Sequence, residues 1–175
     1  MTFGDPQSVA RLRADFDRQG AMQSMGITVA DVAPGRVILE MPFNPAFSQH
    51  HGFMHAGTIT SGMDSACGFA AFTLMDAESE VLTVEFKCSF LAPARGQSFR
   101  FEGNVLKSGR TLTFTEGRAI AVDAGQETTV ATITATMMAV RGLKATSVPL
   151  RLLDHLAQMQ RTGRSLIWCG AKVVA

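Results

Sequence analysis

The sequence predicts an α+β fold in which a curved antiparallel sheet wraps around one long central helix, with an N-terminal helix before this core and an extension after it. Residues 56–75 have the pattern of a helix that is apolar nearly all round, which is typical of a helix buried inside a domain. Residues 81–91 alternate apolar and polar side chains, which predicts a strand with one apolar face. A buried helix and an apolar sheet face cover each other most economically when the sheet wraps around the helix.

The N-terminal helix is expected over about residues 6–19. Asp5 is a suitable N-cap and Pro6 suits the first helical position. Val9, Leu12 and Phe16 then fall on one face, and Gly20 is expected to end the helix.

Six strands are predicted from alternating side chains separated by turn residues. They are expected at 27–33, 36–43, 81–91, 97–107, 111–122 and 127–140. The first two form a hairpin around Pro34 and Gly35. In the strand at 81–91, one face is expected to carry Leu82, Val84, Phe86, Cys88 and Phe90, and the other Thr83, Glu85, Lys87 and Ser89.

The length and composition predict one domain over residues 1–142 and a C-terminal extension over 143–175. Periodic apolar residues predict a helix in the extension, for which two roles are open: packing on the domain or on a neighbouring subunit, or covering substrate. The helix residues are Val148, Leu152, Leu153, Leu156 and Met159.

The charge balance and hydropathy exclude several classes of partner. The 175 residues carry a net charge of +1 without a basic stripe, so no nucleic acid is expected as a partner. The charged N-terminal segment resembles no signal peptide, and no apolar run could span a bilayer, so we expect a cytoplasmic protein that does not enter membranes. Three widely separated cysteines match neither a disulfide framework nor a zinc site.

Asp64 is the only formal charge among the 35 residues between Glu40 and Asp76, and it lies on the predicted buried helix. A carboxylate in such a place needs hydrogen-bond donors or a countercharge. Asp64 is therefore either a structural residue tied to nearby donors or a catalytic base whose pKa is raised by burial.

A motif around Asp64 resembles the active site of hotdog-fold acyl-CoA thioesterases of the phenylacetic-acid-degradation type. It consists of Gln49, then His55-Ala56-Gly57, then Asp64 nine residues after the histidine. The resemblance extends over about residues 20–140 and includes the segments 81–86, 90–96 and 105–110. It implies a hotdog fold and hydrolysis of an acyl-CoA thioester to a free acid and coenzyme A.

The resemblance also implies a role for each catalytic residue. Asp64 would activate a water molecule or attack the thioester carbonyl directly, and Thr83 would help to hold that water. Gln49 would orient the substrate carbonyl or the nucleophile. The backbone amide of Ala56 or Gly57 at the helix N-terminus would stabilise the oxyanion. Such a reaction needs neither a metal nor an organic cofactor.

The expected substrate-binding residues are of three kinds. Phe53, Met54 and Met63 are either core residues or walls for the acyl chain. Lys107 and Arg110 flank a turn that resembles a position where the family contacts the phosphates of coenzyme A, although solvated charges are common there. His55 is expected to order the loop by hydrogen bonding, and His50 and His51 to line the entrance of the pocket. We predict that these histidines hold no metal, because they precede the helix and form no His-Glu-x-x-His pattern.

Helix geometry predicts that a second subunit completes the site. Ala56 and Asp64 are separated by ~12 Å along one helix, too far to act easily on one carbonyl. The family resemblance implies a homodimer with shared active sites, and dimers paired into tetramers.

Two other functions are weighed against the thioesterase: a hotdog-fold hydratase or dehydratase, whose histidine loops are not recognisable here, and a non-catalytic acyl-CoA-binding protein.

Overall fold

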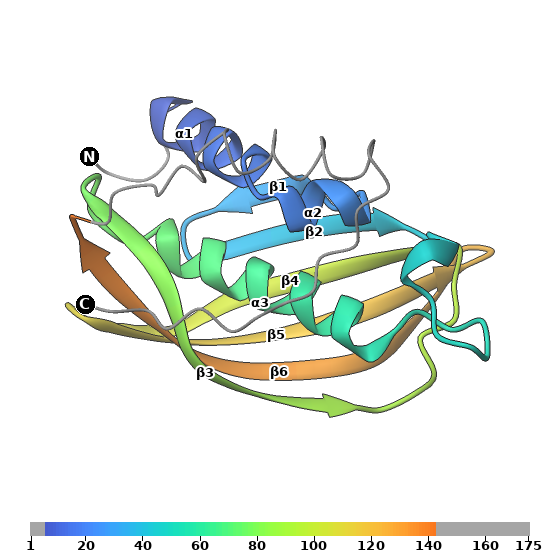
Figure 1. Ribbon diagram of the computed structural model, residues 1–175. Helices are drawn as coiled ribbons and strands as arrows, with labels where there is room; N and C mark the ends of the chain where they lie inside the picture. The colour runs from blue at the N-terminus through green and yellow to red at the C-terminus, as the bar shows by residue number, and fades with distance from the viewer. Residues whose placement is uncertain (1–5, 143–175) are drawn as a thin grey trace, which may run out of the picture. The chain divides into compact units, whose positions relative to one another are not determined.

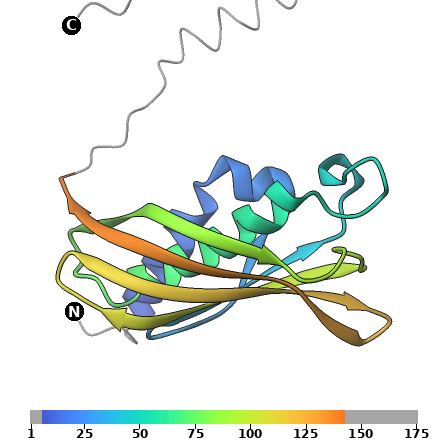
Figure 2. The same cartoon turned by 90° about the horizontal axis from the view of Figure 1, so that it is seen from below.

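The computed structural model describes residues 6–142 and confirms the predicted α+β architecture (Figure 1). Six antiparallel strands form one sheet in the order β1-β2-β4-β5-β6-β3, and the sheet curves around the helix α3. Seen from below, β6 lies between β3 and β5 with the helices behind the sheet (Figure 2). The elements are α1 (Pro6–Asp17), α2 (Gly20–Met25), β1 (Thr28–Ala33), β2 (Arg36–Pro42), the short 3-10 helix η1 (Pro45–Phe47), α3 (Ala56–Phe72), β3 (Ser79–Phe90), β4 (Ser98–Ser108), β5 (Leu112–Asp123) and β6 (Gln126–Arg141). The predicted extension at 143–175 lies outside the described residues.

The core lies between α3 and the concave face of the sheet. Ile59 and Met63 of α3 are fully buried there, together with Phe101 of β4 and Met137 of β6. The helix ends at Phe72, three residues earlier than predicted. The amides of Leu74 and Met75 donate to carbonyls three residues back instead of four, at 3.0 and 3.1 Å, so the helix closes in a tighter turn.

The N-terminal segment forms two helices instead of the single helix predicted over 6–19. In α1, Leu12 and Phe16 are buried as predicted, and the Phe16 ring packs edge-on against Phe69 of α3. Gly20 begins α2 and ends no helix; the prediction was wrong on this point. The left-handed residue that ends this region is Gly26, whose φ of 74° suits a glycine and whose amide donates to the carbonyls of Gln23 and Met22.

A β-bulge in β3 reverses the predicted orientation of its first half. The pairing with β6 shifts register between Thr83 and Glu85, so Val84 is the extra residue. Before the bulge, Thr83 pairs with the fully buried Met137 and faces α3, whereas Leu82 faces away. The predicted faces of Thr83 and Leu82 were therefore wrong, because one extra residue moves every preceding side chain to the opposite face. After the bulge, Phe86, Cys88 and Phe90 face the helix side, as predicted.

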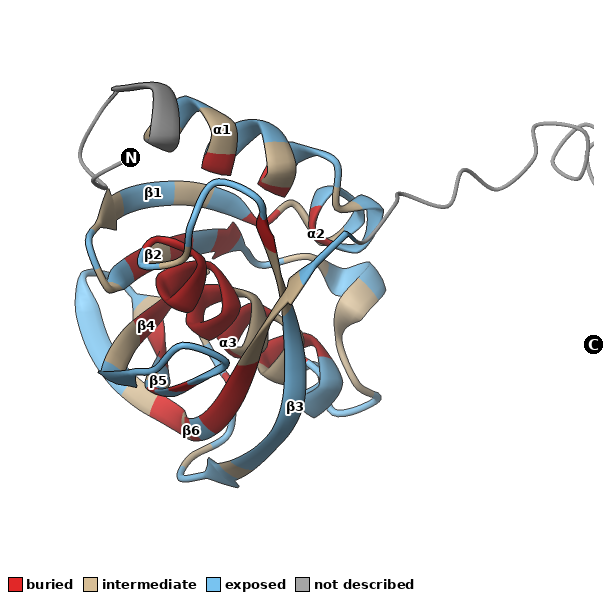
Figure 3. Cartoon of the chain, turned by 90° about the vertical axis from the view of Figure 1, so that its left-hand side faces the viewer, coloured by how far each residue is buried: buried red, intermediate tan, exposed pale blue. Residues whose placement is uncertain are grey.

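Within residues 6–142, no other element covers one stripe of α3 or the free edge of β3. The stripe consists of small and polar residues: Ala56, Gly57, Thr60, Ser61, Asp64 and Ser65. The sequence predicted a helix that is apolar nearly all round, and this stripe is the exception. Strand β3 is an edge strand that is exposed along most of its length, whereas most of α3 is buried (Figure 3).

Candidate active site

A closed loop before α3 presents the Gln49 side chain. The backbone amide of Gln49 donates to the carbonyl of Phe53 at 2.8 Å, and the amide of Gly52 donates to the backbone carbonyl of Gln49 at 2.8 Å. Gly52 has a φ of 79°, a conformation that a glycine adopts without strain. The backbone of Ser48 also bridges that of Met54. These contacts hold Gln49 beside the first turn of α3.

The backbone amides at the start of α3 distinguish the two predicted oxyanion donors. The Gly57 amide donates to Nδ1 of His55 at 2.9 Å, and the amides of Thr58 and Ile59 both donate to the His55 carbonyl. Among the described residues, the Ala56 amide has no acceptor. Because the first-turn amides of a helix lack intrahelical partners, Ala56 retains a donor that Gly57 has already used.

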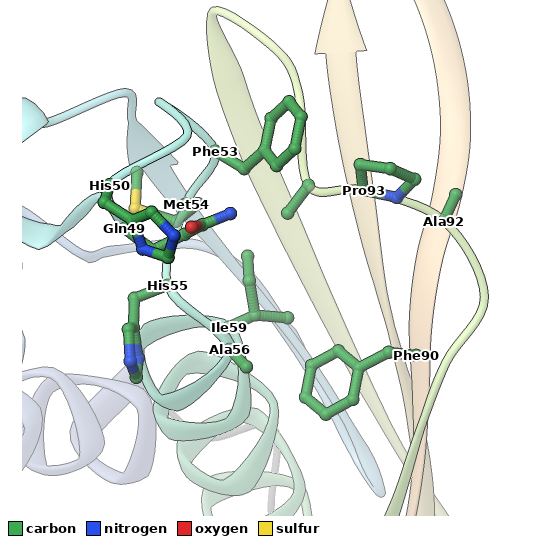
Figure 4. A pocket seen from close by; sticks show the side chains of 11 residues that line it. Gln49, His50, Phe53, Met54, His55, Ala56, Ile59, Phe90, Ala92 and Pro93 are labelled. Carbon is green, nitrogen blue, oxygen red and sulfur yellow. The ribbon is translucent and has the colours of Figure 1, made fainter.

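The Ala56 end of α3 opens onto a cavity of about 660 Å³. Its walls are mainly apolar, and they come from the loop before α3, the first turns of α3 and the segment that follows β3 (Figure 4). The lining residues are Gln49, His50, Phe53, Met54, His55, Ala56, Ile59, Phe90, Ala92, Pro93 and Ala94. The cavity therefore brings together five predicted site residues: Gln49, Phe53, Met54, His55 and Ala56.

Asp64 and Thr83 form a second group, outside the walls of this cavity. The Thr83 hydroxyl donates to Oδ1 of Asp64 at 2.9 Å within the same chain. Burial raises the pKa of the Asp64 carboxyl above its ordinary value of 3.8, and the hydrogen bond from Thr83 offsets part of this effect. A carboxylate with a raised pKa that still borders an uncovered face is suited to accept a proton from water.

Three predicted substrate-binding residues lie away from the cavity of their own chain. Met63 is fully buried in the core. Lys107 pairs with the exposed Phe114, on the face of the sheet that points away from α3. Arg110 lies beside Ser79 at the start of β3, whereas the cavity lies at Phe90, the other end of that strand.

The prediction from sequence did not include Ile59 or the segment Phe90–Ala94 as cavity walls. The apolar residues Phe90, Ala92 and Ala94 have no sequence pattern that separates them from ordinary strand and turn residues. They border the cavity because the Ala94 carbonyl accepts the Met54 amide at 3.0 Å, which holds the two loops together. Their resemblance to the family segment at 90–96 was the only available signal.

Within residues 6–142, no group of three or more histidine, cysteine or acidic side chains is arranged to hold a metal ion. The helices in this part of the chain are also too short or too polar to cross a membrane.

The Cys67 thiol is buried beside Thr115, and burial raises its pKa to about 12. At neutral pH this thiol is protonated and is not a nucleophile.

Comparison with known proteins places the chain among thioesterases. Residues 51–128 match the Thioesterase superfamily. A solved structure of a thioesterase family protein from Silicibacter pomeroyi is 48% identical, with a TM-score of 0.76, over 77% of this chain and 99% of that one. The PaaI protein from the phenylacetic acid degradation operon of E. coli has a TM-score of 0.70 at 16% identity over 78% of this chain and 95% of that one, a likeness of fold.

The similarity to curated relatives covers part of their length. A relative from Saccharolobus solfataricus is 36% identical over 92 residues, which are 53% of this chain and 65% of the relative. Human acyl-coenzyme A thioesterase 13 is 29% identical over 90 residues, which are 51% of this chain and 64% of that protein. The chain thus spans slightly less than two thirds of these two relatives.

Proposed function

Because the chain belongs to the thioesterase superfamily, we propose that it hydrolyses acyl-CoA thioesters at active sites that two protomers share. This membership confirms the prediction of a hotdog-fold thioesterase and, at the level of the family, of a thioester hydrolase. The observation that carries the proposal of a shared site is the separation of two groups in one chain. The unpaired amide of Ala56 borders the cavity, whereas the Asp64–Thr83 pair lies outside it.

The proposed reaction uses only groups of the protein and water. The Asp64 carboxylate accepts a proton from a water molecule whose oxygen attacks the thioester carbonyl carbon. The carbonyl oxygen becomes negative and receives hydrogen bonds from the Ala56 amide and the Gln49 side chain. When the carbon–sulfur bond breaks, coenzyme A leaves as a thiolate and takes up the proton that Asp64 accepted from water. No metal or organic cofactor takes part.

The edge of β3 supports the proposal of a dimer. In the part of the chain that the structure describes, this strand pairs with β6 on one side, and no strand pairs with its other edge. An exposed apolar edge strand of this length readily pairs with another chain. Four large apolar side chains on it are between 44% and 53% exposed: Leu82, Val84, Phe86 and Phe90.

Two-fold pairing of the β3 edges would bring the separated groups together. Phe90 lies at the cavity near Ala56, whereas Thr83 lies beside Asp64. When antiparallel strands meet at a two-fold axis midway between Thr83 and Phe90, near Phe86, each Phe90 lies opposite Thr83 of the partner subunit. The uncovered stripe of α3 would then face the same interface.

A dimer of dimers belongs to the same proposal. The sheet has a second exposed apolar surface on the face away from α3, which includes Leu106, Leu112 and Phe114. An apolar surface of this kind on a soluble domain is typical of an interface. It leaves the shared sites at β3 unobstructed.

The proposal is tested first with Asp64→Asn in a thiol-release assay over a panel of acyl-CoA substrates. We expect a folded variant whose kcat is lower by on the order of 10²-fold or more, the scale for loss of a positioned base. Near-normal turnover in a folded variant would show that Asp64 is not the base.

The shared site is tested by mixing subunits that each carry one defect. Gln49→Ala and Asp64→Asn, each strongly impaired alone, should regain activity when they are refolded together. Random pairing makes half of the dimers mixed, with one intact site each, so recovery should approach roughly a quarter of the wild-type activity. Absence of recovery in confirmed mixed dimers would place both residues in a site within one chain.

A further inference from the structure

We propose that His51 is a positioning residue that turns the Gln49 amide so that its NH2 group donates to the thioester carbonyl. This inference rests on the proposed function. It assigns a task to His51, a residue outside the cavity wall, and it defines which end of the Gln49 side chain meets the substrate.

The oxygen of the Gln49 side chain is already engaged by His51. Gln49 Oε1 accepts the backbone amide of His51 at 3.1 Å, and it lies 3.1 Å from His51 Nδ1. A carboxamide oxygen is only an acceptor, so Nδ1 must carry a hydrogen to bind it. The backbone N–H of His51 is only a donor, and it could not bind the Gln49 nitrogen in place of the oxygen. The chemistry of this turn therefore determines which way the amide points.

The nitrogen of the Gln49 side chain remains available. Among the described residues, no acceptor receives a hydrogen bond from it. Figure 4 shows the side-chain nitrogen of Gln49 turned toward the space between the side chains of Phe53 and Ile59. Together with the unpaired amide of Ala56, this NH2 group makes two donors that border one cavity, the arrangement that an oxyanion requires.

The His51 ring lies close to the rings of two neighbours. Its centroid lies 3.9 Å from that of His50, and 6.5 Å from the stacked ring of Phe53. His51 and His55 use Nδ1 in opposite ways: His51 donates from it to Gln49, whereas His55 accepts the Gly57 amide. The His51 ring thus engages the side chain of Gln49, whereas the His55 ring engages the backbone of the first turn of α3.

A double-mutant cycle tests whether His51 acts through Gln49. His51→Ala removes the ring but keeps the backbone N–H, so we expect kcat to fall by about 10-fold with little change in KM, the effect of losing one orienting hydrogen bond. Gln49→Ala should lower kcat by about 10²-fold, which leaves a measurable rate. In the Gln49→Ala background, adding His51→Ala should cause no further loss.

A conservative variant separates positioning from a structural role. His51→Asn places an amide N–H donor near the position of Nδ1, so it should recover most of the kcat that His51→Ala loses. Three results overturn the inference: wild-type kcat in His51→Ala, an undiminished effect of His51→Ala in the Gln49→Ala background, or no recovery with asparagine.

The failure of the proposed function has a different signature. If Asp64→Asn and Gln49→Ala both retain the wild-type rate, the catalytic site itself is misassigned, and the task of His51 falls with it. If those two variants are impaired while His51→Ala is normal, the site stands and only the positioning inference is refuted. Thermal unfolding of each variant, followed by circular dichroism, verifies that it is folded.

Discussion

Gly103 of β4 lies where the backbone of the sheet comes close to the backbone of α3. A Cβ atom added there would lie 2.3 Å from the carbonyl carbon and oxygen of Ala66 and 2.6 Å from the amide nitrogen of Cys67. These are backbone atoms of a buried helix, so they cannot move aside by a side-chain rotation. Gly103→Ala should therefore displace α3 itself.

The size of the effect follows from the overlap. Ordinary contact with a Cβ atom begins at 3.4 Å, so relief of the 2.3 Å contact requires a shift of 1.1 Å, which is 3.4 minus 2.3. Overpacking of a core costs about 1–3 kcal/mol, and we expect the upper end because backbone must move. For a domain of this size that corresponds to a fall in Tm of about 10 °C. Because α3 carries Ala56 and Asp64, kcat should fall by up to about 10²-fold.

Thermal and urea unfolding together with the thiol-release assay measure both effects, and Gly68→Ala is the matched control. Gly68 lies on α3 itself, and a Cβ added there would meet no neighbouring group within 4 Å. Alanine has the higher helix propensity, so Gly68→Ala should raise stability by up to ~1 kcal/mol. If Gly103→Ala unfolds within about 1 °C of the wild type, the close approach of β4 to α3 is refuted.

Two further variants test charged groups. Because burial raises the pKa of Asp64, its carboxylate destabilises the folded state above that pKa, so Asp64→Asn should raise Tm at pH 8, and this gain should vanish below about pH 3.8. A lower Tm of the variant at pH 8 would contradict this sign. If Lys107 and Arg110 bind the phosphates of coenzyme A, replacing both by alanine should raise KM for acyl-CoA with little change in kcat. The rise in KM should be smaller at high salt, where such contacts are already screened. An unchanged KM at low ionic strength would exclude both residues from the binding site.

Much of the fold and part of the site could be predicted from local sequence. The apolar pattern at 56–75 indicated a buried helix, and the strand alternation indicated a sheet around it, because burial of apolar side chains follows their period along the chain. The isolation of Asp64 indicated a residue with a partner or a chemical role. Its spacing from Gln49 and Ala56 then led to the thioesterase family.

Other features depended on contacts between residues distant in sequence. The period of β3 gave no sign of the bulge at Val84, since a bulge is defined by pairing with β6, and this bulge turns Thr83 toward Asp64. The choice between the amides of Ala56 and Gly57 depended on where the His55 ring folds back. Side-chain periodicity thus determined which residues are buried, whereas strand register and backbone hydrogen bonds, which exist only in the folded chain, decided which polar atoms face the cavity and which face Asp64.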